Sequence, residues 1–593
     1  MAQAVPTTHK SAWSPLAIPL FRALWLATVI SNIGTWAQEA GGPWLMELLK
    51  HSDPKWVALV SVAENLPICL LSVIAGALSD VLDRRKLLIF TQIWMLIASG
   101  LLGVLTLLGL TTPGLLLFFT ATLGIGIALS GPPFQAIVPE LVAPADMPLA
   151  VALNSVALNV ARAVGPALGM IVVIAAGRGT RGPGASFLLN AASFVGVAIV
   201  LYRWRRPKQG GTAHAEQLWG ALKLGFQYTK HSPPMIAILI RVASFIFCAV
   251  AMWAQLPVIA HNQLGLAEGG YATLMACLGA GAVVGVVMMP RLQRMLSIDT
   301  MVVTCTVCFA MGLILLGIVR DAAPAYLLMV FLGFNWVVIP TNFNVATQRS
   351  VPNWVKGRAL SMYLTTLFGS WALSSFVWGT VAKQTSVSIA LMLAGTLMAI
   401  GLLVFSRFRL TLGAGKDYSP AFAATHLPPV APTIILKPDG YPEYHVSVAW
   451  PAHEGLSPHA REFRELRRQR LRNGARSWQL NRHESPTAHW LESFSFRREA
   501  EFEQHHSRTT RADLLLQESI RKFSPQRNLP ADPAPAPRHP AVVWLGDRLY
   551  RCADRALQEI EKAIRRFESQ PEVLPSEPQA LDPLSRYSGR GQG

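Results

Sequence analysis

The first 410 residues contain very little charge. They hold 26 of the 52 Lys and Arg and 12 of the 34 Asp and Glu, so fewer than one residue in ten is charged. Soluble domains average roughly 25%. Residues 411–593 hold the other 26 basic and 22 acidic side chains, an ordinary share. This shortage excludes a chain made only of soluble domains and indicates an apolar body followed by a polar tail.

Several kinds of site are missing as well. The six cysteines form no disulfide framework, because five lie in apolar segments and Cys552 stands alone in the tail. Cys305 and Cys308 are spaced like a zinc pair, but with no second pair and no nearby histidine, packing explains them better. No G-x-x-x-x-G-K-[ST] phosphate loop occurs, so nothing suggests direct use of ATP. We expect no cofactor and no metal.

The net charge of +18 and the pI near 10.0 do not indicate a nucleic-acid partner. The positive charge of the body lies in short connections between apolar segments, which is how membrane proteins use Lys and Arg. A basic stripe with interleaved aromatic residues, typical of nucleic-acid binding, is not found in the sequence.

Long apolar segments dominate the body. A membrane-spanning helix needs about 20 mostly apolar residues, and charges and turn signals divide the body into twelve such segments. They are residues 18–49, 56–79, 86–109, 113–138, 147–176, 184–204, 235–262, 270–290, 298–319, 323–348, 356–382 and 385–407. The first is too long for a signal-peptide core. The sequence therefore predicts an all-α membrane protein with twelve transmembrane helices.

Lys and Arg gather on one side of these segments. With a cytoplasmic N-terminus, the inner connections hold most of the basic residues. The outer connections then hold only Lys50, Lys55, Arg178, Arg181, Arg320 and Lys383. This is the positive-inside pattern. We expect an inner-membrane protein with both termini in the cytoplasm, because the number of spans is even.

The two halves of the body repeat one another. Leu123-Gly124 recurs as Leu332-Gly333, and Pro132 recurs as Pro340, about 208 residues later. Such a repeat predicts two six-helix halves, 1–203 and 235–410, joined by a cytoplasmic linker at 204–234. Parallel repeats of this kind are typical of transporters that work by alternating access.

The connection between the second and third segments has a recognisable pattern. Residues 76–86 read GALSDVLDRRK, which resembles the signature loop of the major facilitator superfamily, G-x-L-[AS]-D-R-x-G-R-[RK]. The resemblance implies a gating loop that includes Gly76, Asp80, Arg84 and Arg85. The sequence departs from this pattern at two positions. Asp83 stands where glycine is usual, and Val81 stands where a basic residue is usual. The alternative is a basic loop that only fixes topology.

Further stretches indicate which branch of the superfamily the sequence resembles. Residues 30–36, 132–136, 152–155 and 162–169 are similar to the enterobactin-exporter-like group, also called transmembrane secretion effectors, and the resemblance covers about 15–410. It implies export of siderophores, drugs or other small amphipathic compounds. Gly165-Pro166-x-x-Gly169 also resembles a motif of proton-coupled antiporters, although small-residue helix packing explains the same stretch.

Polar side chains recur on single helical faces at membrane depth, where they are costly and usually face the protein interior. They are Asn32, Trp36 and Glu39 in the first segment, Glu64 in the second, Gln135 in the fourth, Asn159 and Arg162 in the fifth, Arg241 and Gln255 in the seventh, and Asn335 and Asn342 in the tenth.

By resemblance, the first, fourth, seventh and tenth helices line a central cavity, so these stripes should face substrate and protons. Burial raises a carboxylate pKa, so Glu39 is our candidate for proton coupling. A nearby Arg162 or Arg241 is expected to discharge it or to compete with a substrate. The alternatives are water-exposed vestibule positions for Glu39 and Glu64, a structural ion pair for Arg162 and interhelical hydrogen bonds for the asparagines.

The tail has its own pattern. After a linker at 411–440, residues 441–523 alternate between strand and helix signals in the order β-α-β-β-α, which predicts a small cytoplasmic α+β domain, ferredoxin-like. It resembles the monooxygenase-type extension of many secretion effectors. The matching residues are Arg470, Gly474, Ala475, Trp478, Trp490, Glu492, Glu503, His505, Thr509 and Asp513. Residues 524–593 predict a Pro-rich spacer, an amphipathic helix at 541–568 and a disordered end.

These observations predict a secondary transporter, not an enzyme, that exports a small amphipathic molecule and is coupled to protons. The partners are a small-molecule substrate, protons and the lipid bilayer, with dimerisation or partner contact through the tail. Proton-coupled uptake is the alternative in the same class. A membrane-tethered enzyme or a sensor acting through the tail is the alternative in another, although twelve helices exceed what anchoring requires.

Overall fold

The structure is a computed structural model. It describes residues 13–50, 53–143, 146–177, 179–204, 225–405, 433–436, 442–451, 460–483, 489–497, 501–502, 505 and 508–521. The chain divides into two compact units, 1–525 and 526–593, and every described residue belongs to the first. Most of the predicted linkers, and the predicted final segment at 524–593 with its amphipathic helix, lie outside the described residues.

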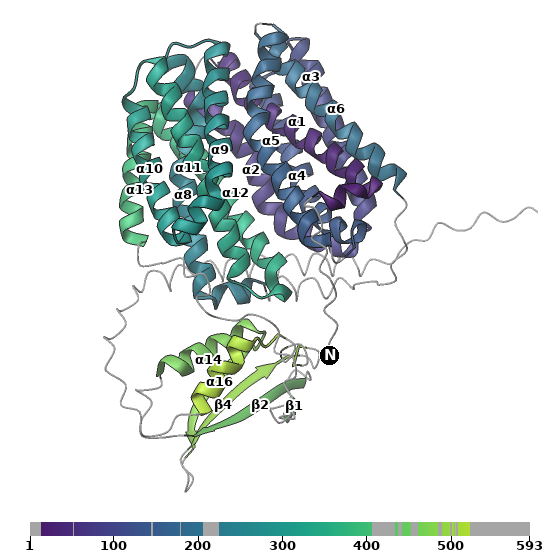
Figure 1. Ribbon diagram of the computed structural model, residues 1–593, viewed down its shortest axis with the longest axis vertical. Coiled ribbons are helices and arrows are strands. Elements are labelled where there is room, and N and C mark those ends of the chain that lie inside the picture. Colours follow the sequence, from purple (N-terminus) through teal and green to yellow (C-terminus); the bar gives the residue numbers. More distant parts are fainter. Residues whose placement is uncertain are drawn as a thin grey trace, which may run out of the picture. The chain divides into compact units, whose positions relative to one another are not determined.

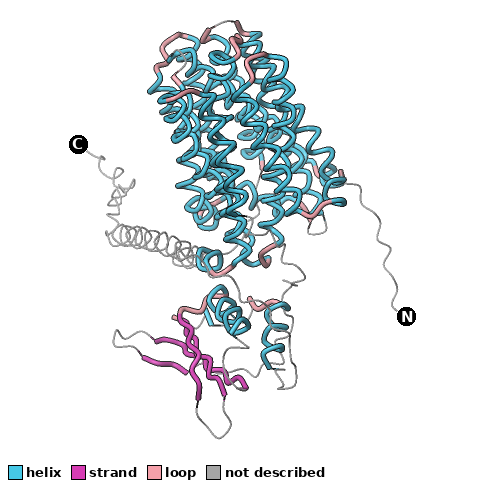
Figure 2. The backbone as a smooth tube through the Cα atoms, turned by 90° about the vertical axis from the view of Figure 1, so that its left-hand side faces the viewer, coloured by secondary structure: helices cyan, strands magenta, loops and turns pink. Residues whose placement is uncertain are grey.

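The apolar body is a bundle of long α-helices (Figures 1 and 2), of which the described residues contain twelve. They are α1 (Pro19–Lys50), α2 (Pro54–Val81), α3 (Arg84–Leu107), α4 (Pro113–Leu141), α5 (Met147–Ala175), α6 (Arg181–Arg203), α8 (Pro233–Val258), α9 (Glu268–Met295), α10 (Ile298–Ile318), α11 (Ala322–Arg349), α12 (Lys356–Gln384) and α13 (Val387–Phe405). Short helical turns η1 (Ser14–Ala17), η3 (Ile259–Gln263) and η4 (Asn353–Val355) adjoin them.

Within the described part of the chain, nine helices are long and apolar enough to cross a membrane. The other three are α1, which carries Glu39 and Glu47, α5, whose described apolar stretch is the shorter Val164–Ala175, and α12, which is rich in Ser and Thr. Polar residues lower the mean hydropathy of α1 and α12, although both are long enough to span. The multi-pass prediction is confirmed, and the full count of twelve spans stays a prediction.

Side-chain caps fix where several helices begin. Asp53 and Asp83 accept hydrogen bonds from backbone N–H groups in the first turns of α2 and α3, and Thr112 and Ser297 do the same for α4 and α10. Such caps satisfy donors that the helix itself leaves unpaired. Asp83 is one of the two residues that depart from the family loop, and its capping role explains why an aspartate suits this position.

The helices α1–α6 pack on one another and so do α8–α13, and the two groups meet where α2 packs against α12 and α5 against α9 (Figure 1). The internal repeat of the sequence corresponds to the same glycine-mediated helix contact in both halves. A Cβ at Gly124 of α4 would collide with the Glu64 carbonyl of α2, and a Cβ at Gly333 of α11 with the Leu278 carbonyl of α9. Each glycine thus allows its helix to touch the backbone of its neighbour.

The described tail is a four-stranded antiparallel sheet with two helices. Its elements are β1 (Thr433–Leu436), β2 (Pro442–Pro451), α14 (Ala460–Arg472), β3 (Ser477–His483), β4 (His489–Phe496) and α16 (Arg511–Arg521), and the strand order is β1-β2-β4-β3. The predicted β-α-β-β-α order is present. The prediction of a continuous linker at 411–440 is wrong, because residues 433–436 pair with β2. Their β-branched Thr-Ile-Ile run suits a strand.

A buried carboxylate organises this tail. Glu492 on β4 is fully buried and accepts hydrogen bonds from Arg470 Nε at 3.0 Å, Trp450 Nε1 at 3.0 Å and Trp478 Nε1 at 2.8 Å. Arg472 pairs with Asp513, which also caps α16. Four of the residues that carry the tail's resemblance to secretion-effector extensions are therefore core-forming residues.

Candidate functional site

A pocket opens between α1, α2, α3, α4 and α6, within the first half of the body. It encloses about 470 Å³ of space between atoms, including its open mouth. Most of its wall is apolar. The polar side chains in the wall are Thr35, Gln38, Glu39, Glu64, Thr120 and Asn190.

Two carboxylates of this pocket come from different helices. Glu39 lies on α1 and Glu64 on α2, and both side chains are half-buried. The sequence named each of them separately, and the structure brings them to one cavity. A carboxylate at membrane depth usually marks an ion or proton pathway. Both carboxylates therefore belong to the lining of one pocket whose wall is mostly apolar.

A hydrogen-bond network lies next to Glu39 in the sequence and includes two residues of the pocket wall, Gln38 and Asn190. Gln38 Oε1 accepts from Ser99 Oγ of α3 at 2.6 Å and from Asn190 Nδ2 of α6 at 2.8 Å. Asn190 Oδ1 in turn accepts from Ser193 Oγ at 3.2 Å. These contacts join three helices and hold α1 in a fixed rotation. Neither Gln38 nor Asn190 was among the predicted site residues, although Asn190 is the one polar residue in the run 187–191.

The rest of the predicted α1 stripe does not line the pocket. Trp36 lies against α5, where its Cβ would contact any Cβ added to Gly165. Asn32 is half-buried one turn earlier. Gln135 is exposed near the end of α4. The side chains of Asn159 and Arg162 lie outside the described residues, so the predicted role of the α5 face stays a prediction.

The predicted gating loop ties helix ends together within the first half. Arg84 pairs with Glu140 at the end of α4, with 3.0 Å between Nη1 and Oε1. Arg85 donates to the carbonyls of Leu201 at 2.8 Å and Tyr202 at 2.7 Å, which end α6. Cations suit a helix C-terminus and its unpaired carbonyls. The Asp80 side chain lies outside the described residues, and Gly76 has open space where a Cβ would stand.

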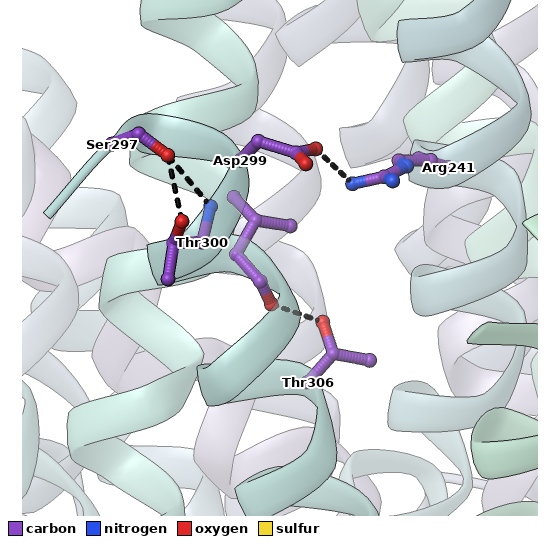
Figure 3. A network of polar contacts seen from close by, with 6 residues as sticks. Arg241, Ser297, Asp299, Thr300 and Thr306 are labelled. Atoms are coloured by element: carbon purple, nitrogen blue, oxygen red, sulfur yellow. Dashed lines mark hydrogen bonds and ion pairs between the residues drawn. The ribbon is translucent and has the colours of Figure 1, made fainter. Parts of the chain in front are cut away.

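In the second half, Arg241 contacts a residue that the sequence analysis did not name. Arg241 of α8 is 5% exposed, and its Nη1 lies 2.8 Å from Asp299 Oδ1 in the first turn of α10 (Figure 3). Ser297 caps the same turn by accepting from the Thr300 N–H at 3.1 Å. Arg241 therefore joins α8 to the start of α10. Its predicted substrate-facing role stays a prediction.

The other predicted polar residues of the second half are buried among helices. Asn335 Nδ2 donates to Phe331 O at 2.8 Å and Asn342 Nδ2 to Val338 O at 2.7 Å, both within α11. Gln255 Nε2 donates to Pro54 O at 3.3 Å, so it reaches across to α2 of the first half. The bonds of the two asparagines to backbone carbonyls stay within their own helix and are not the interhelical bonds given as the alternative. The predicted substrate-facing role of these side chains stays a prediction.

The two halves are in close contact where α1 ends and α2 begins, which we call the α1–α2 end. Lys383 Nζ of α12 lies 2.8 Å from Asp53 Oδ2. Tyr271 of α9 stacks on Trp44 of α1 with ring centroids 5.1 Å apart, and its hydroxyl donates to Ala40 O at 3.4 Å. Ala40 directly follows Glu39. These contacts close the α1–α2 end next to the carboxylate pocket.

The family described as "Transmembrane secretion effector" matches residues 10–531. The chain belongs to this family. Its fold is that of major facilitator transporters: a D-xylose-proton symporter superposes with a TM-score of 0.54 at 14% identity, covering 65% of this chain and 98% of the other. A bacterial homologue of the lysosomal transporter Spinster, in an inward-facing and occupied conformation, superposes with a TM-score of 0.53 at 13% identity, covering 66% and 96%.

Among curated proteins, the chain is similar to the staphyloferrin A transporter of Staphylococcus aureus (strain NCTC 8325 / PS 47). The two are 24% identical over 334 residues, which is 56% of this chain and 82% of the relative. The protein is therefore a multi-pass membrane transporter of the major facilitator type. Within the described residues, no group of three His, Cys, Asp or Glu side chains is placed to hold a metal ion.

Proposed function

We propose that the protein is a proton-coupled exporter of a small amphipathic molecule in the cytoplasmic membrane, working by alternating access. The observation that carries the proposal is the pocket that Glu39 and Glu64 share, beside the contacts that close the α1–α2 end. Similarity to a staphyloferrin A transporter supports including siderophores among the candidate cargoes.

The proposed direction of the cycle uses the positive-inside pattern of the sequence to assign the two ends of the body. If the basic connections are cytoplasmic, the α1–α2 end is the outer one, and the contacts of Tyr271 and Lys383 close it. Cargo would then enter from the cytoplasm. When these contacts open, the pocket meets the outer solution, where Glu39 or Glu64 takes up a proton. Return to the closed state carries that proton inward.

The tail is proposed to regulate the body as a ferredoxin-like module. Within the first compact unit, Gln227 Nε2, just before α8, donates to Ala475 O at 2.7 Å, and the Arg508 guanidinium lies 5.1 Å from the centroid of the Trp354 ring. Both body residues lie at connections that precede helices of the second half. Contacts there can restrain how this half moves.

The test compares a deletion strain complemented with wild type, Glu39→Gln, Glu64→Gln or Glu268→Gln. Glu268 begins α9 and does not line the pocket, so it is the matched control. Mass spectrometry of cells and medium, with and without iron limitation, first identifies a compound that wild type moves out. Its transport into everted vesicles is then measured with and without an imposed proton gradient.

We expect the two pocket variants to lose gradient-driven transport while Glu268→Gln keeps it. If both pocket variants respond to the gradient like wild type, the pocket is not the coupling site. If the deletion strain instead fails to remove a compound from the medium, the protein is an importer.

A further inference from the structure

The exposed side of α14 in the tail is basic. The helix contains six arginines and two glutamates among its 13 residues. Two of the arginines are buried and pair with carboxylates of the tail core. Arg461, Arg464 and Arg467 are exposed, and their spacing of three residues places them along one side of the helix. We call these three residues the arginine stripe.

The acidic residues of α14 are less exposed than the arginine stripe. Glu462 and Glu465 are both half-buried. Glu465 Oε2 lies 3.4 Å from Nη1 of Arg468, a fourth arginine that is itself half-buried. The charges that α14 presents most fully to its surroundings are therefore positive.

Contacts within the first compact unit bring α14 close to the start of α8. Gln227 Nε2 donates to Ala475 O at 2.7 Å, and Ala475 follows the last residue of α14 by three positions. Burial lowers the pKa of His231, and the positive charges of Arg467 and Arg468 lower it further. His231 stands two residues before α8. Two arginines of α14 therefore lie within electrostatic range of the start of a helix long and apolar enough to cross the membrane.

The body is also basic at this end. Because consecutive helices cross in opposite directions, α9 and α11 end where α8 and α12 begin. Arg291 and Arg294 at the end of α9 and Arg349 at the end of α11 are exposed there. An anionic membrane surface attracts each nearby Lys or Arg over a Debye length of about 8 Å at physiological ionic strength. The arginine stripe extends this basic zone into the tail.

A membrane surface fits the arginine stripe better than a single soluble anion does. The rise of an α-helix spreads the three arginines over about 9 Å of its axis. A single phosphate bound by several arginines requires their side chains to converge on it. An array of lipid headgroups instead offers a separate phosphate to each guanidinium, which can donate two parallel hydrogen bonds to it.

We propose that the arginine stripe binds anionic phospholipid headgroups at the basic end of the body and so docks α14 on the membrane. The inference goes beyond the proposed transport function, since it assigns a partner to the tail. It depends neither on the direction of transport nor on proton coupling.

The test measures hydrogen exchange of the full-length protein in lipid nanodiscs, made either of phosphatidylcholine alone or with one third phosphatidylglycerol. A third sample adds inorganic phosphate to the phosphatidylcholine discs and represents a soluble anion. Peptides that cover α14 report docking, and peptides that cover β4 report whether the tail is folded. Arg461→Gln/Arg464→Gln removes two charges of the arginine stripe. Arg497→Gln/Arg511→Gln is the matched control, because it removes two exposed arginines of the tail that lie outside α14.

Exchange over α14 should slow in wild type when phosphatidylglycerol is present. Each arginine near an anionic surface contributes roughly a factor of five to binding, so this slowing should fall at least about tenfold in Arg461→Gln/Arg464→Gln. It should stay as in wild type in Arg497→Gln/Arg511→Gln. If a variant alters exchange over β4, raising the salt concentration on wild type gives the same test, since screening should abolish the slowing.

Three results would overturn the assignment: equal exchange over α14 in the two lipid mixtures, equal loss of the slowing in the control variant, or the same slowing with inorganic phosphate alone. The readout needs no cargo and no proton gradient. Failure of lipid docking therefore leaves the transport proposal standing, and failure of gradient-driven export leaves lipid docking standing.

Discussion

Tyr271 and Trp44 stack with their planes 13° apart, joining the two halves of the body at the α1–α2 end. Tyr271 is 1% exposed and comes from α9, while Trp44 belongs to the helix that carries Glu39. Opening this end must separate the two rings. The stack is therefore a direct mechanical link between the position of the second half and the helix of the pocket.

Tyr271→Ala is expected to favour the state in which the α1–α2 end is open. An aromatic pair contributes about 0.5–1.5 kcal/mol beyond its buried area, enough to shift a balanced equilibrium several-fold. The measurement is cross-linking of an Asp53→Cys/Lys383→Cys pair with a short bifunctional thiol reagent. Tyr271→Phe keeps the stack and should cross-link like the tyrosine protein; equal cross-linking in Tyr271→Ala would show that the stack does not hold this end closed.

Gly124→Ala and Gly333→Ala should each destabilise the body, because the added methyl meets a backbone carbonyl of the adjacent helix. Overpacking of this kind costs about 1–3 kcal/mol. Gly131→Ala is the control on α4, where a Cβ has open space and alanine favours helix by up to about 1 kcal/mol. Thermal unfolding in detergent should place the first two variants below wild type and the control at or above it.

Removing one partner of the Arg241–Asp299 pair should lower the free energy of unfolding by about 1–3 kcal/mol. The loss is smaller than for a fully buried pair, because the Asp299 side chain is 30% exposed. Arg241→Met removes the guanidinium from the Asp299 carboxylate. Adding Asp299→Leu should recover much of the loss, since both charges are then gone. Unfolding midpoints of the two single variants and the double variant measure the coupling; simple additivity would show that the pair is not an energetic unit.

His231 should make stability depend on pH. Burial lowers its pKa, as do the positive charges of Lys230, Arg467 and Arg468, while a hydrogen bond with Gln227 O acts in the opposite direction. The unfolded chain then binds a proton more readily, so stability is constant above about pH 6.5 and falls as the pH drops toward the lower folded pKa, by at most about 1.4 kcal/mol per pH unit.

His231→Gln should remove this acid-sensitive component from unfolding midpoints measured between pH 5 and 7.5. The exposed His261 offers a control, because His261→Gln should leave the profile of wild type unchanged. An identical profile in all three proteins would mean that another group is responsible.

Local patterns in the sequence predicted the helices well. Apolar length and turn signals located helices close to the twelve that form the body, and the loop at 76–86 pointed to the correct superfamily. The polar periodicity of the first segment identified Glu39, which does line a pocket. It also grouped Trp36 with it, whereas that side chain lies against α5. Spacing along one helix shows which side chains share a face, not which neighbour that face meets.

Partnerships between distant segments were beyond the sequence. The pairing of Arg241 with Asp299, 58 residues away, could not be predicted, because nothing in the local sequence indicates it. Gln38 and Asn190 were overlooked for the same reason, since their bond joins residues 152 positions apart. Strand β1 was not predicted because prolines flank it in the sequence. It forms by pairing with β2, whose edge becomes available only once the rest of the sheet has folded.

The backbone contacts at Gly124 and Gly333 determine where a reporter of the transport cycle should be placed. They join α4 to α2 and α11 to α9 with no side chain between, so we expect each of these two helix pairs to move together. Two fluorophores attached to one such pair should record a constant distance through the whole cycle. A fluorophore pair with one label on α2 and the other on α12 should change its distance with each transport cycle of a single molecule.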